Sequence, residues 1–162
     1  MHCTFYSTIA DIPSSLWNEL FDSENPFVQH AFLLALEQSG CVGGNTGWAP
    51  RHMLLANDEG PIAVMPLYYK TDSYGEFVFD WGWAEAYSRH GLDYYPKLVT
   101  AIPYSPVAGP RLGLAATADP VEVVTALLHA IHQLAEKQSC SGWHLLFAGR
   151  RLQNVLVEMK DE

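Results

Sequence analysis

The chain has 162 residues, of which 49% are hydrophobic and 17% are charged, and its formal net charge is −9. This length fits one domain with a substantial core, and the hydrophobic content excludes a mainly disordered chain. The acidic balance argues against DNA as a partner, because phosphate binding needs a basic patch.

The first third of the chain predicts one strand and two helices. Residues 3–8 read as a short strand, and Asp11 begins a helix. Asn25-Pro26 begins a second helix, because a capping side chain is followed by proline at the first helical position. This helix ends before the glycine-rich segment 40–47, which we expect to be a flexible loop without the Lys-Ser/Thr ending of a phosphate loop.

The middle of the chain predicts a hairpin followed by a third strand. Residues 51–56 and 62–69 read as two apolar strands, and residues 57–60 have the composition of a turn. Pro66 marks a bulge or an edge in the second strand, because proline cannot donate to a sheet ladder. Residues 76–81 then read as the third strand.

The last third predicts strands at 98–103 and 143–147 and a long helix at 119–137, preceded by a short helix at 84–90. The long helix has a capping Asp119 followed by proline, and apolar residues recur on one face. Mixed strands and helices indicate an α/β or α+β fold with one sheet and helices packed against it.

Two general features predict the compartment. The three cysteines, Cys3, Cys41 and Cys140, form no Cys-x-x-Cys pair, which favours reduced thiols over disulfides or a thiolate zinc site. The N-terminal residues lack the basic and apolar regions of a signal peptide, and no apolar run approaches the roughly 20 residues of a membrane span. We therefore expect a cytoplasmic protein without a membrane span.

Residues 74–97 are the strongest candidate for a binding site, because aromatic and charged side chains alternate through this window. Aromatic rings supply contact area and charges supply orientation, as in many ligand sites. The alternative is a core strand followed by an amphipathic helix, which we favour for Phe77 and Phe79. For the rest of the group a site role and a packing role are equally supported: Asp80, Trp81, Trp83, Arg89 and His90.

Other motifs give weaker predictions. His129 and His132 are spaced to share a metal, but no third ligand is evident, so we expect a partly exposed helix edge and keep metal binding by these two residues as a weaker hypothesis. Arg111 follows Gly109-Pro110 before the long helix and could hold an anion there, although a structural turn is favoured. The chain contains no Gly-x-Ser-x-Gly nucleophile motif.

Several ordered motifs resemble one family, and they are Asn25-Pro26-Phe27, Gly43–Trp48, Met65–Lys70, Ser73–Trp81, Tyr94–Leu98 and Pro103–Leu112. Over roughly residues 16–147 they resemble the N-terminal half of FemAB-like peptidoglycan biosynthesis/recognition proteins, of the GNAT (N-acetyltransferase-like) superfamily. The resemblance implies a GNAT-like domain at residues 1–147, a mixed, mostly antiparallel sheet flanked by helices. Residues 148–162 would be an atypical C-terminal tail.

The resemblance also implies acyl or aminoacyl transfer to an amine of a peptide-like or cell-wall precursor, with acyl-CoA or aminoacyl-tRNA as the donor. Asp80 or Glu85 would take the proton of the amine. The substrate-binding residues would be Trp81, Trp83, Arg89, His90, Tyr94, Lys97 and Arg111. Because the family has two such halves, we expect either a homodimer or a missing second half. The alternative is a non-catalytic half-domain that serves binding or dimerisation.

Overall fold

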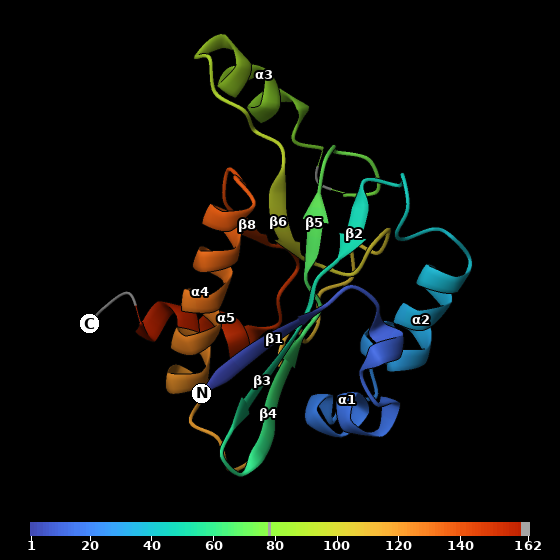
Figure 1. Ribbon diagram of the computed structural model, residues 1–162, viewed down its shortest axis with the longest axis vertical. Helices are drawn as coiled ribbons and strands as arrows, with labels where there is room; N and C mark the ends of the chain where they lie inside the picture. Colours follow the sequence, from blue (N-terminus) through green and yellow to red (C-terminus); the bar gives the residue numbers. More distant parts are fainter. Residues whose placement is uncertain (78, 160–162) are drawn as a thin grey trace.

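The computed structural model describes residues 1–77 and 79–159, which form two four-stranded sheets with helices around them (Figure 1). The strands are β1 (His2–Tyr6), β2 (Trp48–Pro50), β3 (His52–Asn57), β4 (Gly60–Met65), β5 (Tyr68–Lys70), β6 (Lys97–Thr100), β7 (Gly113–Leu114) and β8 (Trp143–Leu145). The helices are α1 (Ser14–Phe21), α2 (His30–Gln38), α3 (Trp81–Arg89), α4 (Pro120–Lys137) and α5 (Arg150–Glu158), and two 3-10 turns lie at Ile9–Asp11 and Pro26–Val28.

The strand order is β1-β3-β4-β7 in one sheet and β2-β5-β6-β8 in the other. All paired neighbours are antiparallel except β6 and β8, which are parallel. The predicted mixed, mostly antiparallel α/β fold is confirmed. The expectation of one sheet is corrected to two, because the strand expected at 62–69 breaks at Pro66 and continues in the second sheet as β5.

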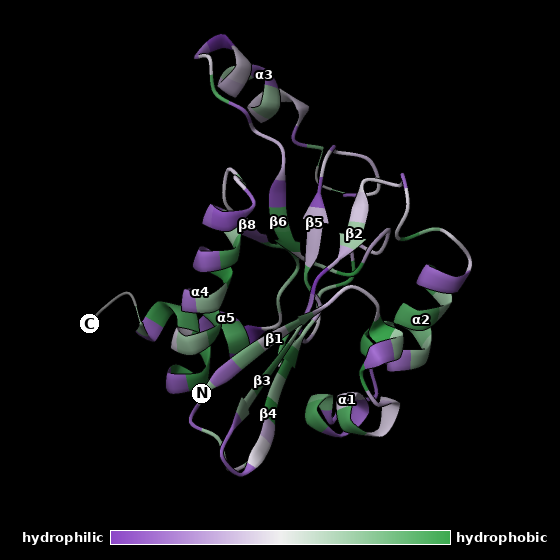
Figure 2. Cartoon of the chain, in the orientation of Figure 1, coloured by the Kyte–Doolittle hydropathy of each residue, from purple (hydrophilic) through white to green (hydrophobic). Residues whose placement is uncertain are grey.

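Successive side chains of β3 point to opposite faces of the first sheet, so they pack into two separate parts of the core. Met53 and Leu55 pack with the buried stripe of α4, whereas Leu54 packs against α1 and α2 with the buried Trp17. Figure 2 shows the apolar colouring of β3 and β4 and the apolar stripe of α4. Both faces of this sheet are therefore covered by helices.

The strand predicted at 76–81 is wrong. Phe77, Phe79 and Asp80 lie outside any strand and α3 begins at Trp81, while Val78 lies outside the described residues. In a strand, residues 76 and 80 would lie about 13 Å apart. Instead Glu76 and Asp80 both contact the Nζ of Lys97, which an extended strand would not allow.

Helix α3 stands away from the two sheets (Figure 1), and none of its residues is buried. Helix α5 occupies part of the segment expected to be an atypical tail, and its Leu152 is buried in a cluster with Val124 of α4. Among the described helices, none combines the length and the apolar character that a bilayer crossing needs.

A pair formed by the buried His52 and the half-buried Glu37 links α2 to β3. His52 Nε2 lies 3.0 Å from Glu37 Oε1, which also accepts from the backbone N–H of Ile9 at 3.0 Å. Burial lowers the pKa of His52 even though Glu37 opposes it. The pKa of Glu37 is raised by burial but lowered more by its hydrogen bonds from His52, Thr8 and Ile9, so the net direction is down.

Both shifts make the fold less stable in acid. An unfolded histidine takes a proton below about pH 6.5, whereas the buried His52 resists it, so stability falls as the pH drops. Glu37 adds a further loss of stability at about pH 4, where the carboxylate of the unfolded chain takes up a proton. We expect the free energy of unfolding of the wild type to fall between pH 7 and 5 by up to about 2 kcal/mol more than that of His52→Gln. Urea unfolding at both pH values measures the difference, and parallel pH profiles of the two proteins would contradict it.

Candidate functional site

Lys97, the first residue of β6, is a buried cation at the centre of the candidate site. Its Nζ donates to Glu76 Oε2 at 3.0 Å and also to Asp80, and it lies 4.9 and 5.2 Å from the ring centroids of Tyr94 and Tyr95. The side chain is wholly inaccessible to solvent. Lys97 therefore ties the loop before α3 to the second sheet.

Asp80 accepts hydrogen bonds from four side chains. The Tyr95 hydroxyl donates to Oδ1 at 2.8 Å, the Tyr94 hydroxyl donates to Oδ2 at 2.7 Å, and Ser73 and Lys97 complete the set. Burial by itself would raise the pKa of Asp80, but these four donors hold it well below its ordinary value. Asp80 is thus a fixed carboxylate with little tendency to take a proton.

Glu76 has the opposite character. Its Oε2 accepts from Lys97, but its buried Oε1 has no hydrogen-bond partner among the residues that the structure describes. Burial raises the pKa of Glu76, and the nearby Lys97 offsets this only in part. A buried oxygen without a hydrogen-bond partner destabilises the fold. Within this cluster, Glu76 is therefore the group that would gain most from a hydrogen bond donated by a ligand.

A cavity of about 300 Å³ opens beside these carboxylates. We call it the acidic pocket, and its lining is Glu76, Asp80, Trp83, Tyr87, Tyr94, His144 and Leu146. The rings of Tyr87 and Tyr94 meet edge to face at 5.1 Å, and His144 meets Tyr94 edge to face at 5.8 Å. Burial lowers the pKa of His144, and the positive charge of Lys97 lowers it further, so its imidazole is neutral at pH 7.

The acidic pocket suits a ligand with a cationic amine. Carboxylate oxygens accept from an ammonium group, and aromatic faces attract a cation through their quadrupole. Lys97 neutralises one of the two carboxylates, so one negative charge is left for a ligand. An amine that enters the pocket would come next to Glu76, which lines it.

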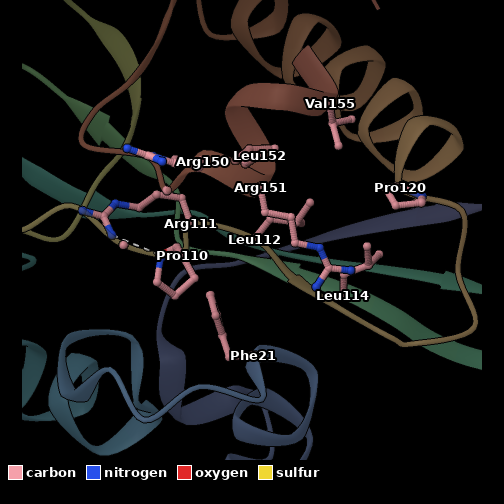
Figure 3. Close-up of a pocket in the computed structure, with 12 residues that line it drawn as sticks. Phe21, Pro110, Arg111, Leu112, Leu114, Pro120, Arg150, Arg151, Leu152 and Val155 are labelled. Carbon is pink, nitrogen blue, oxygen red and sulfur yellow. Dashed lines mark hydrogen bonds between the residues drawn. The ribbon is translucent and has the colours of Figure 1, made fainter. Parts of the chain in front are cut away.

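A second cavity, of about 270 Å³, lies between α1, the loop before β7 and the first turns of α4 and α5 (Figure 3). We call it the arginine pocket, and the labelled side chains are Phe21, Pro110, Arg111, Leu112, Leu114, Pro120, Arg150, Arg151, Leu152 and Val155. Its lining is mainly apolar, with the three arginines as its charged groups. One hydrogen bond links the walls of the two cavities: Arg111 Nε donates to the carbonyl of Leu146 at 3.1 Å.

Arg111 is 1% exposed and donates to three backbone carbonyls, those of Leu146, Pro110 and Val107. Burial lowers its pKa to about 10, so it keeps its charge at pH 7. No carboxylate within residues 1–77 or 79–159 forms an ion pair with it. Arg111 holds its loop against the segment after β8 and leaves a positive charge beside the arginine pocket.

Four of the nine residues predicted for the site line the acidic pocket or hydrogen-bond to Asp80 beside it, and these are Asp80, Trp83, Tyr94 and Lys97. Four others lie on α3 or at its end with exposed side chains, and these are Trp81, Glu85, Arg89 and His90. Glu85 and Arg89 pair with each other at 2.6 Å. Arg111 lies at the arginine pocket.

Sequence reasoning missed Glu76, Ser73, Tyr87, Tyr95 and His144 as site residues. Glu76 and Tyr95 lie inside the aromatic and charged window at residues 74–97, and this position was the sequence signal that could have identified them as site residues. His144 gave none, because its neighbours in the pocket are distant in sequence.

The metal hypothesis gains no ligand set. His129 hydrogen-bonds Gln133 at 3.0 Å, and His132 lies 3.7 Å from Glu136 on the exposed side of α4. In the part of the chain that the structure describes, no group of three or more His, Cys, Asp or Glu side chains could hold a metal ion.

Comparison with known proteins gives one match. The model of a family described as FemAB-like, peptidoglycan biosynthesis/recognition, matches residues 8–160, which includes both pockets and α5. No curated protein and no solved structure matches the chain.

Proposed function

Because the chain belongs to the FemAB-like peptidoglycan biosynthesis/recognition family, we propose that it binds an amine of a peptide-like cell-wall precursor in the acidic pocket and serves acyl or aminoacyl transfer to that amine. The observation that carries the proposal is the buried, unpartnered Oε1 of Glu76 in a pocket walled by aromatic rings. The family match supports a peptidoglycan-related substrate, and the pocket chemistry supports its amine as the group that enters.

In the proposed reaction Glu76 acts as the general base. Its Oε1 accepts a proton from the ammonium group, and the amine nitrogen then attacks the carbonyl carbon of the donor ester or thioester. A C–N bond forms and the C–O or C–S bond breaks. The nitrogen gives up its second proton, and the leaving oxygen or sulfur takes up that proton. Asp80 positions Lys97 and Tyr94 rather than taking the proton, because four donors already saturate it.

The donor would lie in the arginine pocket. An apolar cavity with Arg111, Arg150 and Arg151 suits a molecule with an acyl part and phosphate groups, as in acyl-CoA or aminoacyl-tRNA. Separate titrations with acetyl-CoA and aminoacyl-tRNA test this part. We expect heat from one of them, and Arg151→Ala should weaken that donor without changing binding of the amine.

Calorimetric titration with a sugar-free peptide that carries one lysine tests the proposal for the acidic pocket. The matched ligand is the same peptide with the lysine acetylated, which keeps the length but removes the charge and the nucleophile. We expect the lysine peptide to bind at least tenfold more tightly than the acetylated one. Equal affinities, or no heat from either peptide with folded protein, would contradict amine binding.

A second candidate function is recognition without transfer, with the chain acting as a binding or dimerisation module. The exposed position of α3, which buries none of its residues, favours this reading. Binding of the lysine peptide without turnover in the presence of either donor would support it. Sedimentation of the free protein would then distinguish a recognition module from a homodimer.

A further inference from the structure

The imidazole of His144 lines the acidic pocket and has no part in the reaction described above. That reaction removes two protons from the substrate nitrogen. Glu76 takes the first, and the second must still travel to the leaving oxygen or sulfur. A positioned side chain that carries a proton in this way typically speeds a reaction by about 10²–10⁴-fold.

The other side chains of the pocket are poorly suited to take the second proton. Asp80 accepts from four donors, which hold its pKa well below the ordinary value although burial opposes them. The phenols of Tyr87 and Tyr94 keep their own protons at pH 7, and the hydroxyl of Tyr94 donates to Asp80. Trp83 and Leu146 have no basic atom. With Glu76 holding the first proton, His144 is the base that is left.

His144 is held in place by its ring and its backbone, while its nitrogens stay free. The ring meets the ring of Tyr94 edge to face at 5.8 Å, and the backbone lies opposite Val99 in the parallel pairing of β8 with β6. Among the residues that the structure describes, neither ring nitrogen has a hydrogen-bond partner. The side chain is half-buried, so the imidazole is fixed without being sealed from the pocket.

The charges around His144 keep the imidazole in the form that accepts a proton. The charged groups near it are Lys97 on β6 and the carboxylates Glu76 and Asp80 in the loop before α3. Burial lowers the pKa of His144, Lys97 lowers it further, and Asp80 opposes both. A neutral imidazole can accept a proton, and the resulting imidazolium is acidic enough to release it again near neutral pH.

The chain segment that carries His144 also forms part of the arginine pocket. His144 and Leu146 line the acidic pocket, and a few residues later Gly149 and Arg150 line the arginine pocket. The hydrogen bond from Arg111 to the carbonyl of Leu146 joins the two walls. Of the two basic groups of the acidic pocket, His144 therefore stands on the wall that is shared with the proposed donor site.

We propose that His144 is a second catalytic residue, which carries a proton from the attacking nitrogen to the leaving atom. This inference rests on the proposed function and adds a group to its reaction. The lone pair of the nitrogen forms the C–N bond while the imidazole takes the second proton. The electron pair of the C–O or C–S bond leaves with oxygen or sulfur, which receives that proton from the imidazolium. One proton ends on Glu76, one ends on the leaving group, and His144 returns to its neutral form.

His144→Gln tests the proton transfer, because glutamine stays polar but cannot take up and release a proton. The lysine peptide is the acceptor, and acetyl-CoA and aminoacyl-tRNA are the donors. We expect kcat to fall by about 10²-fold or more, while the lysine peptide binds within about threefold of its wild-type affinity. His132→Gln is the matched control, because His132 lies on the exposed side of α4 and lines neither pocket. It should keep the wild-type rate.

Free imidazole added to His144→Ala separates proton transfer from packing. The substitution leaves a gap beside the ring of Tyr94, where a free imidazole can take the place of the missing side chain. We expect imidazole to raise the rate of His144→Ala by about tenfold or more. The wild type and Glu76→Gln should gain nothing, because both keep His144. Urea unfolding checks that the glutamine and alanine variants are folded.

The outcomes separate the role of His144 from the proposed function. The inference would be overturned by a His144→Gln rate above about one tenth of the wild-type rate, or by a His144→Ala rate that imidazole does not change. A loss of rate that weaker peptide binding explains in full would also overturn it, since His144 would then only shape the pocket. In each of these cases a slow Glu76→Gln variant keeps the proposed function standing. No transfer by the folded wild type with either donor would reject both.

Discussion

The Lys97→Met variant is expected to lose about 3–5 kcal/mol of its free energy of unfolding at pH 7. The substitution keeps a similar volume but removes the cation that contacts both Glu76 and Asp80. Both carboxylates are nearly inaccessible to solvent, so the variant would bury two negative charges without the cation that contacts them both. Urea unfolding, followed by far-ultraviolet circular dichroism, measures the loss.

The pH dependence of this loss identifies its cause. Acidification protonates the carboxylates and removes their repulsion, so the gap between Lys97→Met and the wild type should narrow between pH 7 and 5. Arg89→Met is the matched control, because Arg89 pairs with Glu85 on the exposed face of α3. It should change stability by less than about 0.5 kcal/mol. A loss below about 1 kcal/mol for Lys97→Met, or a gap that does not depend on pH, would contradict the role of Lys97.

Elements with strong local determinants were predictable from sequence. Helix α4 was predicted to the residue at its start, because Asp119 caps it by accepting from the backbone N–H groups of Val121 and Glu122, and Pro120 follows. Helix α5 was missed for the opposite reason. Its N-cap is Gly149, which offers no capping side chain.

The candidate site was only partly predictable, because long-range contacts form it. The alternation of Glu76, Phe77 and Phe79 favours a strand locally, yet hydrogen bonds to Lys97, 21 and 17 residues away from Glu76 and Asp80, override that preference. Composition identified the right window of the chain. It could not show that Asp80 has all its acceptors filled while Glu76 Oε1 has no partner among the described residues, since that difference depends on Ser73, Tyr94 and Tyr95 converging on one carboxylate.

The Glu76→Gln variant is expected to lower the rate of acyl or aminoacyl transfer to the lysine peptide by about 10²–10⁴-fold. Glutamine keeps the shape of the side chain but cannot take a proton from the ammonium group. The rate is measured by mass spectrometry of the acylated peptide, with acetyl-CoA and with aminoacyl-tRNA as donors. Glu85→Gln is the matched control, because Glu85 is a mainly exposed carboxylate on α3 outside the acidic pocket.

The pH profile separates a base from a residue that only shapes the pocket. Glu76 can accept a proton only when it is ionised, and burial raises its pKa above the ordinary value of about 4.3. The wild-type rate should therefore fall as the pH drops through that raised pKa, whereas the residual rate of Glu76→Gln should lack this step. Glu85→Gln should keep both the rate and the step. If Glu76→Gln retained half of the wild-type rate, or the same acid step, the proton would have to leave through another group of the pocket, and His144, which is neutral at pH 7, would be the group to replace next.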